Sequence, residues 1–226
     1  MIRAHGYLAD MYRPAAFDVA DRDDLYDMVE REAFGHLVTV GPHGLDSTGL
    51  PFLLDRERGQ LRGHLARANP HWRSLDASPT LVIFAPSDAF VSPSWYPSKH
   101  EHGRVVPTWN YEVVHVHGTV RVHDDIEWTR TMVSDITDRH ESARSPEVPW
   151  AVSDAPRQFI DAQLRAIVGI SVEITSIEGK RKLSQNRSAD DRDGVVEGLR
   201  RSERDGDRAV AAAMTLLGGV SSENRD

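Results

Sequence analysis

Residues 92–111 gather side chains that suit a flat ligand with polar edges. The segment starts with SPSWYPSK at 92–99 and ends with VPTWNY at 106–111, so it supplies two Trp, two Tyr, Ser, Thr, Asn and Lys. Aromatic rings offer flat walls, while hydroxyls, amides and an ammonium group offer hydrogen bonds and charge. This composition favours a binding wall over a core segment. Trp109 and Tyr111 fit equally well as core or interface anchors, and that alternative stays open.

A second group of polar residues lies at 64–73, with the sequence HLARANPHWR. Arg67 and Asn69 come shortly before Pro70, and proline suits the first position of a helix. A phosphate group binds backbone N–H groups, hydroxyls or amides together with at least one cation. The pattern is compatible with a phosphate site at the start of a short helix. The alternative is that Asn69 only caps the helix while Arg67 and Arg73 lie in solvent.

Eleven histidines raise the question of a metal site. His115 and His117 have the i, i+2 spacing that places two rings on one face of a strand, and His100 and His102 lie in a turn before it. The sequence specifies no third ligand. A hydrogen-bonded polar strand face is the favoured interpretation, and we expect no metal.

The elements that would hold these groups are mainly strands. Alternating apolar residues and turn signals predict strands at residues 35–41, 48–54, 60–66, 80–86, 111–123 and 167–177. Helical spacing predicts helices at 21–33 with Asp21 as N-cap, from 70, at 126–140, at 156–166 and from 190. Because no strand-helix-strand alternation appears, a small antiparallel barrel with peripheral helices fits best.

Composition excludes several classes of function. The chain has 226 residues, a formal net charge of −8 and a pI near 5.7, so strong direct DNA binding is disfavoured. Cysteine is absent, which excludes disulfides and thiolate chemistry. Serine-hydrolase and Walker motifs are also absent. With no long apolar run and no signal peptide, we expect no membrane association and a cytoplasmic protein.

Five blocks, in this order, resemble the PaiB-like, FMN-binding negative transcriptional regulator family. They are MYRP at 11–14, the segment 64–73, the segment 92–99, the segment 106–118, and KLSQNR at 182–187 followed by GVVEGL at 194–199. The resemblance implies a mainly β (α+β) fold, an antiparallel split β-barrel of Greek-key type with peripheral helices. It also implies FMN as cofactor, bound at a homodimer interface, and negative regulation of transcription.

The resemblance sets the expected domain boundaries and site residues. We expect a flexible extension at 1–10, an FMN-binding split-barrel domain at 11–205, and a C-terminal helix with a frayed tail at 206–226. Asn69 and His71 stand where split-barrel flavoproteins carry a phosphate-gripping Ser-x-Lys turn, with Arg67 as counter-charge. The full expected cofactor-binding set is His64, Arg67, Asn69, His71, Trp72, Ser94, Lys99, Thr108, Asn110, Gln185 and Arg187. No catalytic residue is specified.

The flavin ring needs a flat slot, hydrogen bonds to its pyrimidine edge and a nearby cation. Ser94, Lys99, Thr108 and Asn110 offer these groups, and Trp95 and Trp109 offer walls. Gln185 and Arg187 come from the later turn, which the resemblance implies can reach the cofactor of the partner subunit.

Three functions stay open at this point. The first is a homodimeric FMN-binding regulator, for which direct operator binding is uncertain because the chain is acidic and no recognition helix is evident. The second is an FMN-dependent oxidoreductase acting on a small molecule, since fold alone does not fix function. The third is a dimeric interaction module that has lost its flavin, because Asn69 and His71 depart from the Ser and Lys of related sites.

Overall fold

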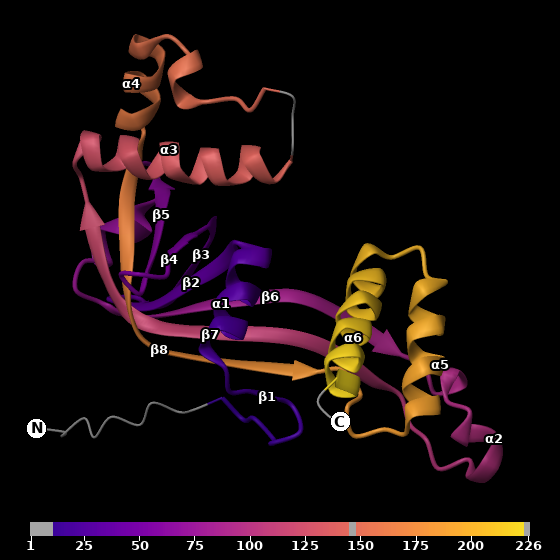
Figure 1. Ribbon diagram of the computed structural model, residues 1–226. Helices are drawn as coiled ribbons and strands as arrows, with labels where there is room; N and C mark the ends of the chain where they lie inside the picture. Colours follow the sequence, from indigo (N-terminus) through magenta and orange to yellow (C-terminus); the bar gives the residue numbers. More distant parts are fainter. Residues whose placement is uncertain (1–10, 145–147, 224–226) are drawn as a thin grey trace, which may run out of the picture. The chain divides into compact units, whose positions relative to one another are not determined.

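The computed structural model describes residues 11–144 and 148–223, which form two units (Figure 1). The barrel unit comprises residues 21–86, 114–144 and 148–177, and the hairpin unit comprises residues 11–20, 87–113 and 178–223. The expected extension at 1–10 and the last three residues of the expected tail lie outside the described residues. Among the described helices, none has the length and apolar composition needed to cross a membrane.

The strands pair in the order β3-β2-β6-β7-β8-β5-β4, with β1 added to β8. Their bounds are β1 Asp18–Val19, β2 Phe34–Gly41, β3 Gly44–Pro51, β4 Leu53–Asp55, β5 Gln60–Ala66, β6 Pro79–Val91, β7 Thr108–His123 and β8 Ile167–Lys182. The pairs β2–β3, β2–β6, β4–β5 and β5–β8 are antiparallel. The partners β2–β6 and β5–β8 are not consecutive along the chain, which is the Greek-key arrangement. The expected antiparallel split barrel is confirmed.

In the barrel unit, alternation along the strands builds the core. On β5, Leu61, Gly63 and Leu65 are buried on one face, and Arg62 and His64 lie on the other. The chain from β3 to β4 passes close to β5, and a methyl group on Gly63 would lie 3.0 Å from the carbonyl oxygen of Pro51. Glycine at this position therefore allows the two backbones to approach and curve the sheet.

Helices lie outside the strands of the barrel unit. Helix α1 (Arg22–Glu32) begins as expected, since the Asp21 side chain accepts hydrogen bonds from the backbone N–H groups of Asp23 and Asp24. The remaining helical segments are η1 (Pro70–Ser74), α3 (Ile126–Ala143), η3 (Val152–Asp154) and α4 (Arg157–Arg165). Helix α3 packs on β5, where Arg62 forms an ion pair with Asp135 at 2.7 Å.

In the hairpin unit, two helices run side by side after the last strand (Figure 1). They are α5 (Ala189–Arg200) and α6 (Asp205–Glu223), and they follow the short segments η2 (Pro93–Trp95) and α2 (Ser98–His102) in the chain. Their buried faces join the ends of β6 and β8 in an apolar cluster of Ala89, Val91, Tyr96, Leu183, Val195, Leu199, Val210, Ala211 and Met214. This cluster positions the aromatic segment that follows β6.

Three strands are longer in the structure than the sequence predicted. Strand β6 continues through Ser87 to Val91, β7 begins at Thr108, and β8 continues to Lys182. The continuation of β6 alternates buried Ser87, Ala89 and Val91 with exposed residues, as a strand does. It was not predicted because proline is unusual inside a strand and Pro86 suggested that the strand ends there. The expected strand at 48–54 is divided into β3 and β4 at Phe52.

Candidate functional site

The aromatic segment and the late turn meet in the hairpin unit. The side-chain amide of Asn110 donates to the hydroxyl of Ser184 at 3.0 Å, and this hydroxyl donates back to the Asn110 carbonyl oxygen at 3.1 Å. Asn110 is fully buried, and its amide also contacts the sulfur of Met214 at 3.4 Å. The hydrogen-bonding groups of Asn110 are thus satisfied by the protein itself.

Lys182, at the end of β8, lies beside the start of β7. Its ammonium group donates to the hydroxyl of Thr108 at 2.7 Å and to the backbone carbonyl of Trp109. Burial, followed by the positive charges of Lys180 and Arg187, lowers the pKa of Lys182. A partly desolvated ammonium group among other cations attracts an anion strongly.

Aromatic rings surround these cations. The guanidinium of Arg187 lies 4.9 Å from the ring centroid of Tyr96, and the ammonium of Lys180 lies 5.4 Å from that of Tyr111. Trp109 is 48% exposed and packs edge-on against Phe90, so a large indole face remains open to a ligand. Trp109 and Phe90 alternate with Asn110, Ala89 and Val91, so the Trp109 ring lies on the opposite strand face from the cluster that holds Tyr96. The cations beside Tyr96 and Tyr111 suit an anionic ligand.

The other residues expected to bind the flavin ring differ in whether their polar groups are free to contact a ligand. Ser94 and Lys99 are exposed, and the ammonium of Lys99 lies 3.3 Å from the Ser94 hydroxyl. The amide of Gln185 is already used, because it accepts from the backbone N–H of Leu183 at 2.7 Å and donates to the carbonyl of Arg181. Gln185 therefore shapes the turn that carries Arg187.

Two glycines of α5 hold the aromatic segment in place. A methyl group on Gly194 would lie 2.1 Å from the carbonyl oxygen of Trp95, and one on Gly198 would lie 2.3 Å from the Trp95 ring. Both are far closer than real contacts, so only glycine lets Trp95 approach the helix. The GVVEGL block thus has a packing role.

The expected phosphate residues form a separate group in the barrel unit. Asn69 is the N-cap of η1, where its side-chain oxygen accepts from the backbone N–H of His71 at 3.0 Å. Its amide nitrogen donates to the hydroxyl of Thr48 at 3.2 Å. His71 is buried, and its Nε2 and Nδ1 lie 2.8 Å from the hydroxyls of Thr39 and Thr48.

These contacts define one consistent proton arrangement. Because Thr48 accepts from Asn69, it can donate to Nδ1 of His71, which then donates from Nε2–H to Thr39. This arrangement requires a neutral ring. Burial lowers the pKa of His71, which favours that neutral form despite the opposing charge of Asp46.

Arg67 and Trp72 also have protein partners. The guanidinium of Arg67 forms an ion pair with Asp124 at 2.5 Å and donates to the carbonyls of Arg165 and Ile167. The indole N–H of Trp72 donates to the carbonyl of Arg67 at 3.0 Å. Both side chains stay partly exposed, so a ligand can still reach them.

His64 lies on the β5 face that carries Arg62, and α3 packs on this strand. Burial lowers the pKa of His64. His115 and His117 share one face of β7, with ring centroids 6.4 Å apart, as their spacing predicts. The assignment of cofactor roles to the eleven expected residues, and the expectation that no metal binds, both stay predictions.

Sequence reasoning missed the contributions of Lys182 and Ser184. Both lie inside the KLSQNR block, where Lys182 ends β8 and Ser184 begins the turn. Thr39 and Thr48 were also missed. Their signal was weaker, because an isolated threonine on a strand gives no hint of a histidine partner 32 or 23 residues away.

Comparison with known proteins identifies relatives along most of the chain. The family model FMN_bind_2, described as "Putative FMN-binding domain", matches residues 11–176. The "Protease synthase and sporulation protein PAI 2" of Bacillus subtilis is 30% identical over 207 residues, which cover 90% of this chain and 96% of that protein.

Two solved structures have a similar fold. The FAD and heme binding protein from Mycobacterium smegmatis has a TM-score of 0.56 at 19% identity, with 77% of this chain and 78% of that chain covered. The flavocytochrome Anf3 from Azotobacter vinelandii has a TM-score of 0.53 at 11% identity, with 73% and 68% covered. At these identities the likeness concerns the fold alone.

Proposed function

We propose a flavoprotein function on one premise: the chain belongs to the FMN-binding domain family. FMN is the cofactor of that family, and when bound it supplies electron or hydride transfer at its ring. The residues of the hairpin unit fit such a ring, since they offer the partly buried ammonium group of Lys182 and the guanidinium group of Arg187 over the ring of Tyr96.

The observation that carries the proposal is the joining of the aromatic segment to the late turn through Asn110 and Ser184. This link holds the turn that carries Arg187 against the start of β7, and Lys182 is placed beside it by its own hydrogen bonds to Thr108 and Trp109. In the proposal Lys182 provides the cation that stabilises negative charge on the ring, while Asn110 and Gln185 position the segment instead of touching the ligand. Ser94, Lys99 and Thr108 bind its polar edge.

For the phosphate, we assign the cationic contact to Arg67. Its guanidinium donates to Ile167, the first residue of β8, whereas Lys182 is the last residue of that strand, so in the proposed homodimer the two side chains serve one FMN from different copies of the chain. The Arg67 guanidinium is partly exposed, and one of its five N–H donors is left after its contacts with Asp124, Arg165 and Ile167. Asn69 and the first N–H groups of η1 supply neutral donors in this proposal. His71 holds Asn69 and Thr48 in position from the buried side, and His64 and Trp72 support the same strand and turn.

We further propose that two copies assemble as a homodimer that acts in negative transcriptional regulation of the PaiB-like type. The relationship to the Bacillus subtilis protein supports this assignment. Direct operator binding has little support, because α5 carries four acidic and two basic residues, and α6 carries a single arginine. Light scattering tests the dimer, and a promoter-specific gel shift at physiological salt tests DNA binding.

A flavin-dependent oxidoreductase is the second candidate function. The specific observation in its favour is the cation group of Lys180, Lys182 and Arg187, because positive charge beside a flavin favours the reduced, anionic ring. Stopped-flow mixing with NAD(P)H distinguishes the two. Rapid bleaching of the flavin band would favour the enzyme, and a stable oxidised band would favour the regulator.

The direct test of flavin binding is titration of the purified chain with FMN, followed by fluorescence quenching. We expect saturable quenching with one FMN per chain. Absence of quenching, together with colourless freshly purified protein, would instead support an interaction module without flavin.

A further inference from the structure

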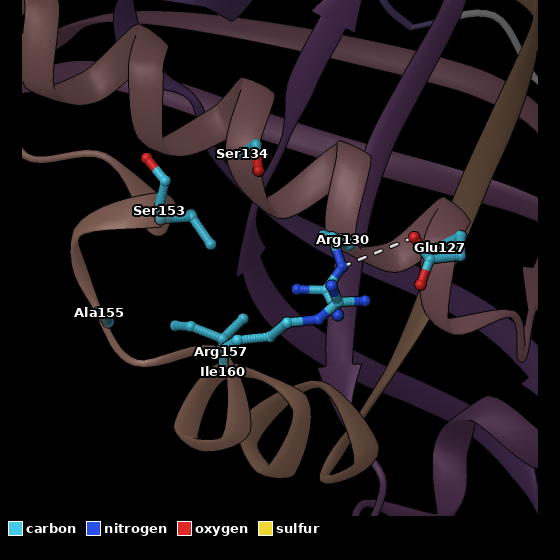
Figure 2. Close-up of a pocket in the computed structure, with 8 residues that line it drawn as sticks. Glu127, Arg130, Ser134, Ser153, Ala155, Arg157 and Ile160 are labelled. Atoms are coloured by element: carbon cyan, nitrogen blue, oxygen red, sulfur yellow. Dashed lines mark ion pairs between the residues drawn. The ribbon is translucent and has the colours of Figure 1, made fainter.

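A cavity of about 520 Å³ lies in the barrel unit among α3, η3 and α4 (Figure 2). None of the residues expected to hold FMN lines it. Its lining residues are Glu127, Arg130, Ser134, Val152, Ser153, Ala155, Arg157 and Ile160. A cavity of this size, walled by both charged and apolar side chains, is typical of small-molecule sites.

The side chains of Arg130 and Arg157 point toward each other, from α3 and from the start of α4 (Figure 2). Arg130 is already paired with Asp161, and its Nε lies 3.7 Å from the carboxylate of Glu127. Within residues 11–144 and 148–223, no ion pair neutralises Arg157. Two guanidinium groups aimed at one space repel each other, and an anion between them converts that repulsion into attraction.

The start of α4 adds to the positive potential at Arg157. This residue opens a nine-residue helix, and Pro156 at the N-cap brings no side-chain hydrogen bond to the first N–H groups. Free N–H groups at a helix start favour an anion. They act here beside the guanidinium of Arg157.

Apolar side chains line another part of the cavity. Val152 and Ile160 are buried in an apolar cluster with Leu164, and Ala155 packs against it. A simple inorganic anion would satisfy the charge at Arg157 but leave in water the small apolar surface that Val152, Ala155 and Ile160 still present to the cavity. A ligand with an apolar body covers it and gains free energy from the burial.

We propose that this cavity binds a small organic monocarboxylate with an apolar body. The carboxylate lies at Arg157, with Arg130 as a second donor, and the apolar body rests on Val152 and Ile160. A single negative charge matches the site, because Arg130 is already compensated by Asp161 and Glu127 while Arg157 is not. The hydroxyls of Ser134 and Ser153 accommodate a further polar group.

Calorimetric titration of the full chain with saturating FMN present tests the proposal. Benzoate combines the two required properties, acetate has the charge alone, and benzyl alcohol has the apolar ring alone. We expect benzoate to bind with one site per chain, and the other two to bind at least tenfold more weakly.

Variants then locate the site. Arg157→Gln should weaken benzoate at least tenfold, because a charged hydrogen-bond pair is lost. Ala155→Phe keeps both guanidinium groups but fills the cavity, and it should also abolish binding. Arg144→Gln is the matched control, since Arg144 is exposed at the end of α3 and does not line the cavity.

The proposal is overturned if benzoate fails to bind, if Arg157→Gln binds it as tightly as the unaltered protein, or if acetate binds equally well. Displacement of FMN by benzoate would also overturn it, because the ligand would then act at the flavin site. FMN titration of Arg157→Gln should be unchanged, which separates this site from the proposed flavin function.

Discussion

Asn110 and Ser184 exchange two hydrogen bonds, at 3.0 and 3.1 Å, across 74 residues of sequence. Both residues are buried in the hairpin unit. Because Ser184 begins the turn that carries Arg187, this pair fixes the turn against the first residues of β7. The position of Arg187 relative to β7 therefore depends on this pair.

Removal of this link should destabilise the protein. Asn110→Ala leaves the hydroxyl of Ser184 buried without its partner, and we expect a loss of about 2 kcal/mol in the free energy of unfolding. Urea denaturation measures the loss. Asn186→Ala, at an exposed position in the same turn, is the control and should change stability by less than about 0.5 kcal/mol. Equal stability of the two variants would contradict a structural role for the pair.

The close approach of Trp95 to α5 predicts a strong effect of a single methyl group. Gly194→Ala places that group against the Trp95 carbonyl, a backbone atom that cannot move aside, and should cost about 2 kcal/mol. Thermal denaturation measures the change. Gly218→Ala is the matched control in α6, where nothing lies within 4 Å, and it should raise stability by about 0.5 kcal/mol. A neutral Gly194→Ala would show that η2 does not pack as described.

Stability should decrease in mild acid. Burial lowers the pKa of His71, His64 and His123 in the barrel unit, so the unfolded chain binds more protons than the folded protein just below pH 6.5. Above about pH 6.5 these histidines do not reduce the free energy of unfolding. This free energy falls as the pH drops from about 6.5 toward the lowered pKa values of the folded protein. Urea denaturation between pH 7.5 and 5.5 measures the slope.

An NMR titration of the ring protons assigns this effect to individual histidines. We expect the His71 ring to titrate below its ordinary range, because its hydrogen bonds to Thr39 and Thr48 hold the neutral form. A midpoint at or above about 6.5 for His71 would contradict the proton arrangement derived for this group.

Arg67 allows the phosphate assignment to be separated from ring binding. Riboflavin carries the same ring as FMN without the phosphate, so Arg67→Gln should weaken FMN by about tenfold and leave riboflavin unchanged. Fluorescence quenching measures both affinities. Arg73→Gln is the control, since Arg73 is exposed and stacks on Trp72. Equal weakening of both flavins in Arg67→Gln would assign Arg67 a purely structural role through Asp124.

Much of the barrel could be predicted from the sequence because strands such as β5 and β6 alternate buried residues with less buried ones. Helix α1, with its Asp21 cap, and η1, with proline at its first position, followed from local signals alone. The ends of β6 and β8 were missed, since residues such as Ala89 and Leu183 are buried only by contacts with the distant α5 and α6. Local periodicity cannot report such long-range burial.

The candidate site shows the same limit. Residue types pointed to two segments that meet in the hairpin unit, those of Asn110 and Arg187, while the cofactor role of these segments stays a prediction. Their roles depended on partners that spacing does not reveal, and so Asn110 and Gln185, which have the chemistry of ligand-binding amides, are engaged by protein groups. Lys182 gained its significance from burial beside Thr108, which needs the folded sheet.

The central claim is that a flavin ring binds beside Lys182, and titration of Lys182→Gln with FMN and riboflavin tests it most directly. Loss of the ammonium group should weaken both flavins by about tenfold, because they share the ring. Arg201→Gln is the control and should bind both flavins normally. Among the contacts found in residues 11–144 and 148–223, the Arg201 side chain pairs only with Glu197, on the exposed face of α5. Unchanged affinity of Lys182→Gln for both flavins would contradict the account.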